Sequence, residues 1–472
     1  MPSRIPGATL AAALALAAAA LAPAGLTAQE PPPVSSEPAP PAPPGQPAHG
    51  EGHAHLAPDD TWRLERQALI DAVLAENPGL EAARMALAAA RERVPQATSL
   101  DDPMLAYSFG PLSIASDEVP FGQAVEARQR FPYPGTLRLR GEAARAEADM
   151  AVEELETVRL ELATAASLLY DDYYLVHRAL AINAEHVRLL ESFKRIATAR
   201  YAAGEAPQQD PIQAEVELAH LVHREMELGT TREVVTARLN ALLHRPPGSP
   251  LPPPVERLPL AEHPALEPDA LEESALAARP ELGRLTAERA AREAAVELRE
   301  LARYPDFEAM ASYNSMWMDT AHQWMVGVAV NLPIWRDRIR AGVAEARAEA
   351  DRVESERERL ADEIRAETRV AWARLEESHH ILEIYESRLL PASRDQVRAA
   401  LSGFETGQVS FLALIEAERN QRSVELEYEE NLADLYRRRA ELARALGRLP
   451  VGAEGISVAG GTEPPATEGD PR

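Results

Sequence analysis

The sequence predicts a mainly α-helical protein with a transmembrane β-barrel sector, built from two copies of a helix–β-hairpin–long helix–helix unit. Three observations lead to this fold class: motifs that recur about 202 residues apart, four short stretches in which apolar and polar residues alternate, and two helical runs of about 65 residues. A period of this length indicates a duplicated domain-sized unit, because solenoid repeats are only about 20–50 residues long.

Both copies begin and end with the same motifs. Leu-Ala-x-x-Pro-x-Leu starts at Leu74 and again at Leu276, and Leu-x-x-x-Leu-x-Arg-x-Pro starts at Leu239 and again at Leu442. The two offsets, 202 and 203 residues, are nearly equal. The two units have therefore kept the same internal layout.

Composition sets the boundaries of the segments. A basic start followed by a run of Ala and Leu predicts a secretory signal peptide in residues 1–28. A transmembrane anchor is the alternative, but it needs about 20 apolar residues. The other predicted segments are a disordered leader rich in Pro and containing His (29–60), repeat 1 (61–247), a Pro-rich linker (248–267), repeat 2 (268–450) and a disordered tail (451–472).

Each repeat contains two stretches of period-two hydrophobicity, which predict strands that are apolar on one face. The strands are expected at about 103–110, 122–131, 306–317 and 323–332. This length and pattern is typical of outer-membrane barrel strands. A half-buried hairpin in a soluble protein shows the same alternation and remains the alternative.

Helices are predicted on both sides of the strands. The opening helices are expected at about 62–95 and 268–303, and the long helices at about 138–203 and 338–403, with an interruption or kink at Pro391. A 65-residue helix would extend about 98 Å and needs coiled-coil packing. A short turn with Gly follows each long helix, and the last helices run to about 245 and 447.

Composition also excludes several classes of function. The net charge of −26 argues against nucleic acid and against anionic lipid surfaces as main partners. The chain has no Cys, and therefore no disulfide and no lipid-modified N-terminal Cys. It also lacks an HExxH motif, a phosphate-binding loop and a GxSxG elbow, so we expect neither an enzyme nor a cofactor.

Four amphipathic strands cannot close a barrel, because the smallest transmembrane barrels use about eight strands. An open sheet edge is not tolerated in lipid. If the strands span a membrane, the chain must form an oligomer to which each protomer contributes a sector. The pattern therefore predicts an oligomeric β-barrel that continues into a long helical tube.

The layout resembles the TolC family of outer-membrane efflux channels, and most closely its heavy-metal efflux (CzcC-like) branch. The resemblance covers about residues 60–450 and depends on the order and duplication of the motifs given above. Phe131-Pro-Tyr-Pro-Gly135 at a strand end, and the turns Tyr201-x-x-Gly204 and Phe404-x-x-Gly407, also contribute.

The resemblance implies a homotrimer with a 12-stranded barrel in the bacterial outer membrane and an α-helical tunnel in the periplasm. It implies contact with outer-membrane lipid, a periplasmic adaptor (membrane fusion) protein and an inner-membrane efflux pump, of the RND type. The adaptor would dock on the turns that contain Tyr201, Gly204, Phe404 and Gly407. The cargo would be heavy-metal cations; a drug or organic-solute channel of the same architecture, or a soluble periplasmic coiled-coil scaffold, are the alternatives.

The family closes its tunnel with acidic residues six and nine positions after a turn Gly. Position six holds Asp210 in the first repeat and Ala413 in the second, and position nine holds Gln213 in the first and Glu416 in the second, so the acids are Asp210 and Glu416. In a trimer either residue would form a ring of carboxylates, which favours cations in a narrow pore. Exposed acids at a helix start, favoured by the helix dipole, are the alternative explanation.

Two groups of residues are candidate metal ligands. Glu217, His220 and His223 recur at three-residue spacing, and Met316 and Met318 lie in a loop that also contains His322. Thioether and imidazole groups are suitable ligands for Cu(I). A helix stripe that happens to contain two His, and an interfacial aromatic belt formed by Trp317 and Trp324, are the simpler explanations. Separately, the leader contains His49, His53 and His55 close together, which could hold a soft divalent metal ion or be only part of a linker.

Overall fold

The computed structural model describes residues 63–114, 121–260, 267–317 and 322–450. The signal peptide, the leader with its three His and the tail lie outside these ranges, as does Met318. In the first half the elements are α2 (Arg66–Glu76), α3 (Pro78–Thr98), β1 (Met104–Phe109), a 3₁₀ turn (Pro111–Ser113), β2 (Gln123–Phe131), α4 (Thr136–Ala202) and α5 (Gln209–Leu242). In the second half they are α6 (Pro268–Ala278), α7 (Pro280–Leu301), β3 (Phe307–Asn314), β4 (Trp324–Val330), α8 (Arg336–Ile384), a π-helical turn (Tyr385–Leu389), α9 (Leu390–Glu405) and α10 (Phe411–Ala445).

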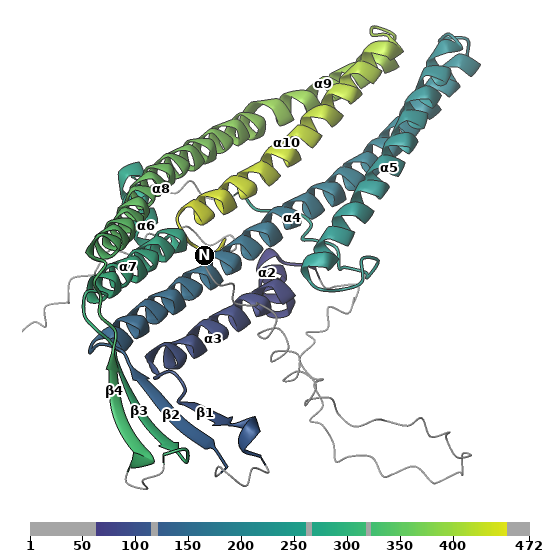
Figure 1. The fold of residues 1–472 in the computed structure, drawn as a ribbon. Helices are drawn as coiled ribbons and strands as arrows, with labels where there is room; N and C mark the ends of the chain where they lie inside the picture. Colours follow the sequence, from purple (N-terminus) through teal and green to yellow (C-terminus); the bar gives the residue numbers. More distant parts are fainter. Residues whose placement is uncertain (1–62, 115–120, 261–266, 318–321, 451–472) are drawn as a thin grey trace, which may run out of the picture. The chain divides into compact units, whose positions relative to one another are not determined.

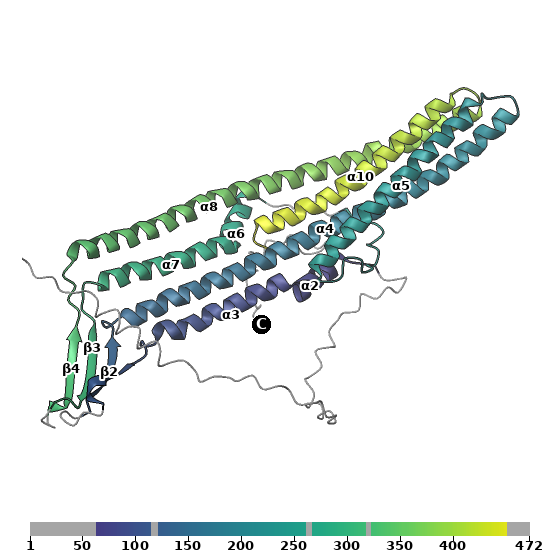
Figure 2. The ribbon, with the colours of Figure 1, turned by 45° about the vertical axis from the view of Figure 1, so that its right-hand side comes forward.

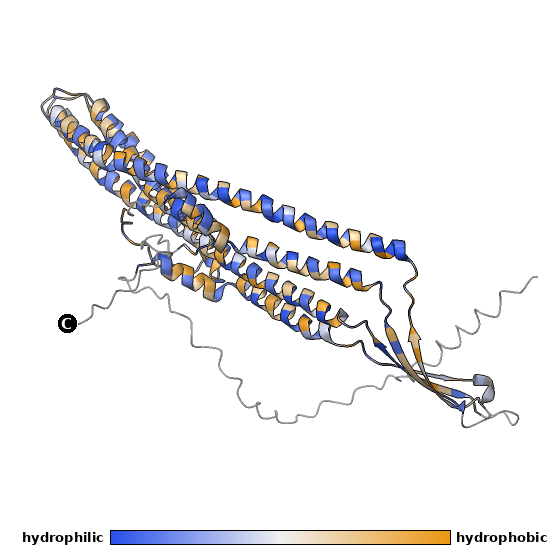
Figure 3. Cartoon of the chain, turned by 90° about the vertical axis from the view of Figure 1, so that its left-hand side faces the viewer, coloured by the Kyte–Doolittle hydropathy of each residue, from blue (hydrophilic) through white to orange (hydrophobic). Residues whose placement is uncertain are grey.

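The four strands form one antiparallel sheet in the order β1-β2-β3-β4. The central pair joins the two halves of the chain, with Val125 opposite Tyr313 and Ala127 opposite Ala311. Apolar residues recur along the strands (Figure 3). Those on one face, such as Val326 and Val328, are largely exposed. In the described part of the chain, this apolar face of the sheet is therefore left exposed.

The helices extend from the sheet in two hairpins. α4 and α5 form one hairpin, α9 and α10 form the other, and both turns lie at the end remote from the strands (Figures 1 and 2). α10 packs along α4 as well as α8, so the two hairpins share a core. None of the helices in the described ranges is long and apolar enough to cross a membrane.

The prediction of a single opening helix in each repeat was wrong. Each stretch is divided in two, immediately before Pro78 and Pro280. Asn77 (ψ 122°) and Arg279 (ψ 118°) are extended, because a proline ring disfavours the helical conformation in the residue before it. The Asn77 side chain then caps α3 by accepting a hydrogen bond of 2.8 Å from the backbone N–H of Gly79.

The long helices lie close to the predicted ranges, with an interruption near Pro391 in the second. α4 has 67 residues and spans about 100 Å. In the second half the π-helical turn precedes α9, whose first turn contains Pro391. Pro391 has no N–H to donate to the carbonyl of Ser387, so the regular ladder cannot continue through this point.

Candidate functional site

The two turns at the ends of the hairpins have the same backbone geometry. Gly204 and Gly407 have φ values of +75° and +74°. After each glycine, a backbone N–H reaches back to close the helix: Glu205 donates to the Arg200 carbonyl at 2.9 Å and Gln408 to the Gly403 carbonyl at 2.8 Å. Both turns are thus glycine-terminated Schellman motifs, in which other residues are strained.

The aromatic residues of the two turns are not equivalent. The Tyr201 ring is 45% exposed, whereas Phe404 is only 3% exposed. The Phe404 ring lies between the Arg200 guanidinium (4.8 Å) and the Phe411 ring (5.2 Å). Tyr201 is therefore exposed, whereas the Phe404 ring is part of the core and the residues that follow it in the turn, up to Gln408, are exposed.

Arg200 connects the two turns. Its guanidinium stacks on Phe404, donates to the Phe404 carbonyl and lies 3.7 Å from the Glu205 carboxylate. Phe404 lies in the last turn of α9, in the second repeat. A side chain from the first repeat therefore interacts with the negative end of a helix in the second. One arginine thus ties the two tips together.

The candidate gate residues lie just beyond the turns. Asp210 is in the first turn of α5 and is half-buried; burial raises the pKa of its carboxyl group, and Arg200 partly opposes this shift. Glu416 lies on α10 and is exposed. The two carboxylates therefore differ in environment within one protomer.

The structure does not bring the first candidate metal ligands together. Glu217 is buried, and its carboxylate accepts a hydrogen bond of 3.0 Å from Nε of Arg419 on α10. His220 and His223 are exposed on another face of α5, and His223 lies 3.9 Å from Glu227. Three-residue spacing therefore does not place Glu217 beside the two imidazoles.

Met316, the remaining described candidate, lies at the end of β3 beside Gly122, and its side chain is largely exposed. Within the described ranges, no group of three or more His, Cys, Asp or Glu has the arrangement of a metal site. The chain therefore offers any resident metal ion few ligands in these regions.

A buried charged cluster that was not predicted from the sequence joins the hairpins further from the tips. Nδ1 of His186 on α4 lies 2.8 Å from Glu418, and Nε2 lies 3.1 Å from Glu425, both on α10. Burial alone would lower the pKa of His186, but the hydrogen bonds and charges of the two carboxylates raise it to about 9. The only sequence signal is a pair of acids seven residues apart in α10, which does not identify a partner 232 residues away.

Comparison with known proteins shows which proteins this chain resembles. Residues 271–448 match the model of the family described as outer membrane efflux protein. This similarity covers most of the second half of the chain. The matched range begins in α6 and includes β3, β4 and the whole of the second hairpin.

The curated relative and the solved structures agree with this family. The cobalt-zinc-cadmium resistance protein CzcC of Cupriavidus metallidurans is 27% identical over 263 residues, which cover 53% of this chain and 59% of that protein. CusC, for which conformational changes accompanying folding and transmembrane channel formation are described, matches with a TM-score of 0.70 and 18% identity over 81% of this chain and 92% of that one. VceC of Vibrio cholerae matches with a TM-score of 0.68 and 16% identity over 81% of this chain and 96% of that one. The efflux protein fold thus extends over both halves of the chain.

Proposed function

We propose that the protein is the outer-membrane channel of a tripartite efflux system and passively conducts substrate from a pump–adaptor complex out of the cell. The sheet is the observation that carries the proposal. Its apolar face is exposed on the side of Val326 and Val328, and the family match covers β3 and β4, two of the four strands that form this face. An exposed apolar band with a polar opposite face is the arrangement of a barrel wall in lipid.

The channel is a homotrimer with a 12-stranded barrel. β1 and β4 are both edge strands, so each leaves a row of unpaired backbone groups. Pairing β4 of one copy with β1 of the next satisfies these groups, and three four-stranded sheets give a barrel within the usual range of strand numbers. The α-helical hairpins then form the periplasmic tunnel.

The tunnel tips dock a periplasmic adaptor linked to an inner-membrane pump of the RND type. Support comes from the first turn, where Tyr201 is exposed and no atom lies within 4 Å of a Cβ added at Gly204. Replacing Gly204 with Val strains the turn without a clash, so export should fall while the amount of trimer in the outer membrane stays the same. Unchanged export by Gly204→Val would show that docking occurs elsewhere.

Heavy-metal cations are the proposed cargo. The supporting observations are the similarity to a cobalt-zinc-cadmium resistance protein, the net charge of −26, and the acids Asp210 and Glu416 close to the tips. A carboxylate ring favours cations. A strain without this gene should become sensitive to zinc, cobalt or cadmium; sensitivity to organic dyes alone would favour the drug-exporting alternative.

A pair of matched variants tests the membrane assignment. Val328 on β4 is 70% exposed and Met226 on α5 is 69% exposed. An arginine at the centre of a barrel's lipid face costs about 2–4 kcal/mol, whereas a charge on a solvated helix costs little. We expect Val328→Arg to deplete the trimer from the outer-membrane fraction and Met226→Arg to leave it unchanged. Equal tolerance of both, with a crosslinked monomer in the soluble periplasm, would refute the channel and favour the soluble scaffold.

A further inference from the structure

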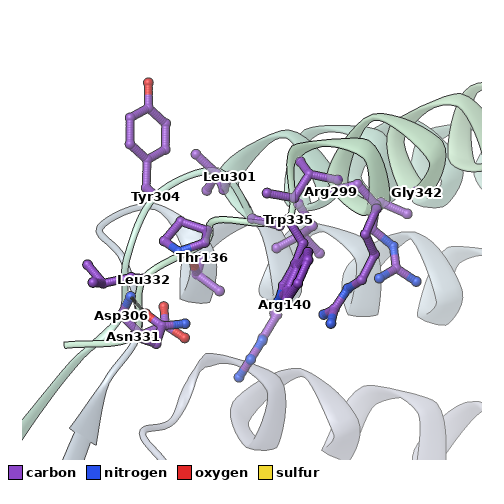
Figure 4. A pocket seen from close by; sticks show the side chains of 16 residues that line it. Thr136, Arg140, Arg299, Leu301, Tyr304, Asp306, Asn331, Leu332, Trp335 and Gly342 are labelled. Atoms are coloured by element: carbon purple, nitrogen blue, oxygen red, sulfur yellow. Dashed lines mark hydrogen bonds between the residues drawn. The ribbon is translucent and has the colours of Figure 1, made fainter. Parts of the chain in front are cut away.

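A pocket of about 690 Å³ lies where the sheet meets the helices. It is lined by the first turns of α4 and α8, by the end of α7 and by the segments that lead into β3 and out of β4. Three arginines line it: Arg140 from α4, Arg299 from α7 and Arg338 from α8. Figure 4 labels Arg140 and Arg299. The pocket therefore gathers cations from three helices that are far apart in the sequence.

The described part of the chain balances only part of the positive charge of this pocket, through the electrostatic interaction of Asp306 with Arg140. In the described part of the chain, none of the three arginines forms an ion pair with a carboxylate. The acid that lines the pocket, Asp306, already accepts hydrogen bonds from Arg130 at 2.7 Å and from the backbone N–H of Tyr133 at 2.9 Å. Most other arginines on these helices pair with a nearby acid, as Arg138 does with Glu142 at 2.6 Å. In a chain with a net charge of −26, three unpaired arginines around one cavity indicate an anionic ligand.

The start of α8 adds to this positive field. No side chain caps its N-terminus, where Trp335 is the N-cap residue and lines the pocket. The dipole of a long helix favours an anion at this end, and Asp337 in the first turn, which pairs with Arg340, offsets part of this field. In Figure 4, Trp335 lies beside Arg140, while Asp306 and Asn331 lie on the opposite side of the pocket.

The other side of the site is apolar and exposed. Leu332 and Trp335, both in the pocket wall, are 74% and 70% exposed. Leu332 continues the alternation of the apolar face of β4 beyond the end of the strand. Trp residues at the edge of an apolar band are typical of the interface between a membrane and water. An anion with attached acyl chains fits an arginine pocket beside such an edge.

We propose that this pocket binds the phosphate of an anionic phospholipid headgroup at the periplasmic edge of the outer membrane. Arg140, Arg299 and Arg338 donate to the phosphate oxygens, since a guanidinium matches a phosphate better than an ammonium does. The acyl chains lie along Leu332 and the strand. The net negative charge of the chain argues against anionic lipid as a general partner, but the local charge at this junction is positive. The lipid as the source of the phosphate depends on the proposed outer-membrane location.

The test uses the purified full-length trimer in detergent, with bound molecules counted by native mass spectrometry. The probes are phosphatidylglycerol, phosphatidylcholine and soluble glycerol phosphate. We expect phosphatidylglycerol to bind at least tenfold more tightly than the other two. Replacing Arg140, Arg299 and Arg338 with Gln should weaken its binding at least tenfold, and Arg338→Gln alone should weaken it about threefold.

The matched control replaces three exposed arginines on the hairpins, Arg188, Arg195 and Arg398, with Gln and removes the same charge. This control should bind phosphatidylglycerol as the wild type does. Equal binding by the pocket variant and the control, or equal binding of phosphatidylcholine, would overturn the site. Equal binding of glycerol phosphate would overturn the lipid assignment. Circular dichroism of each variant confirms folding, and Arg338→Gln provides the reading if the triple variant does not fold. Binding is measured on purified protein, so a failure of the outer-membrane assignment would appear in the fractionation test and not here.

Discussion

The cluster of His186 with Glu418 and Glu425 predicts a pH-dependent contribution to the stability of the helical hairpins. The pKa of His186 is raised to about 9 from an ordinary value of 6.5. A group whose pKa is higher in the folded state stabilises that state fully when the pH is below its pKa in the unfolded chain. The stabilisation is lost as the pH rises through its pKa in the folded state. Since one unit corresponds to about 1.4 kcal/mol, the contribution is roughly 3 kcal/mol below pH 6.5 and disappears above about pH 9.

The variant His186→Gln removes this charge and keeps a side chain that can form hydrogen bonds. Arg422, 3.6 Å from Glu418, and Arg394, 3.5 Å from Glu425, stay in place as the remaining cations. We expect the variant to be less stable than the wild type by about 3 kcal/mol more at pH 6 than at pH 10.

The assay is guanidinium unfolding of the purified protein in detergent, followed by circular dichroism of the helices between pH 6 and pH 10. His223→Gln is the control, because the imidazole of His223 is 73% exposed. The control should follow the wild-type pH profile throughout. A gap between His186→Gln and the wild type that stays constant with pH would refute the assignment of a charged imidazole to this cluster.

Three further predictions test the remaining sites. Gly204 and Gly447 both have positive φ, but an added Cβ meets nothing within 4 Å at Gly204 and lies 2.6 Å from the Ala278 carbonyl oxygen at Gly447. In guanidinium unfolding, Gly204→Ala should lower the free energy of unfolding by about 1 kcal/mol and Gly447→Ala by about 1–3 kcal/mol more. Equal losses of stability would contradict this. Neutralising Glu416 as Glu416→Gln should weaken cation selectivity and block by millimolar divalent metal in planar-bilayer recording; equal block in both proteins would remove Glu416 from the pore. Arg66→Met should lower the free energy of unfolding by about 3–5 kcal/mol, because it leaves the buried carboxylate of Asp171, 2.9 Å away, without its partner. The double variant Arg66→Met with Asp171→Leu should recover most of this loss in the same unfolding assay. No recovery would show that the pair acts mainly through packing.

The elements were predictable where one periodicity runs over many residues. β2 (Gln123–Phe131) lies within the predicted range 122–131, where Val125, Ala127 and Phe131 alternate with charged residues on the opposite face. The helix breaks before Pro78 and Pro280 were also encoded in the sequence, since both follow from the proline ring. Both breaks lie inside the repeated Leu-Ala-x-x-Pro-x-Leu motif, whose proline sets the position of the break in each repeat.

The site was predictable only as far as its backbone. The conformations of Gly204 and Gly407 follow from the residue type and its place after a long helix. The difference between Tyr201 and Phe404 does not, because it depends on Arg200, which reaches Phe404 across 204 residues of sequence. The ion pair of the buried Glu217 with Arg419 likewise depends on how the two repeats pack, which no local sequence pattern predicts.

The two tips differ in exposure although the repeats are similar in sequence. A Cβ added at Gly407 would lie 3.5 Å from the Arg200 guanidinium, whereas the space around Gly204 is open. Arg200 covers the second turn and fixes it to the first, and no equivalent side chain covers the first turn in the described structure. A partner that approaches the tips therefore meets an open turn with an exposed Tyr201 and a closed turn held by an internal cation. If the adaptor docks here, we expect Tyr201→Ala to reduce export and Phe404→Ala to reduce the stability of the hairpins, because only the first ring is free to contact another protein.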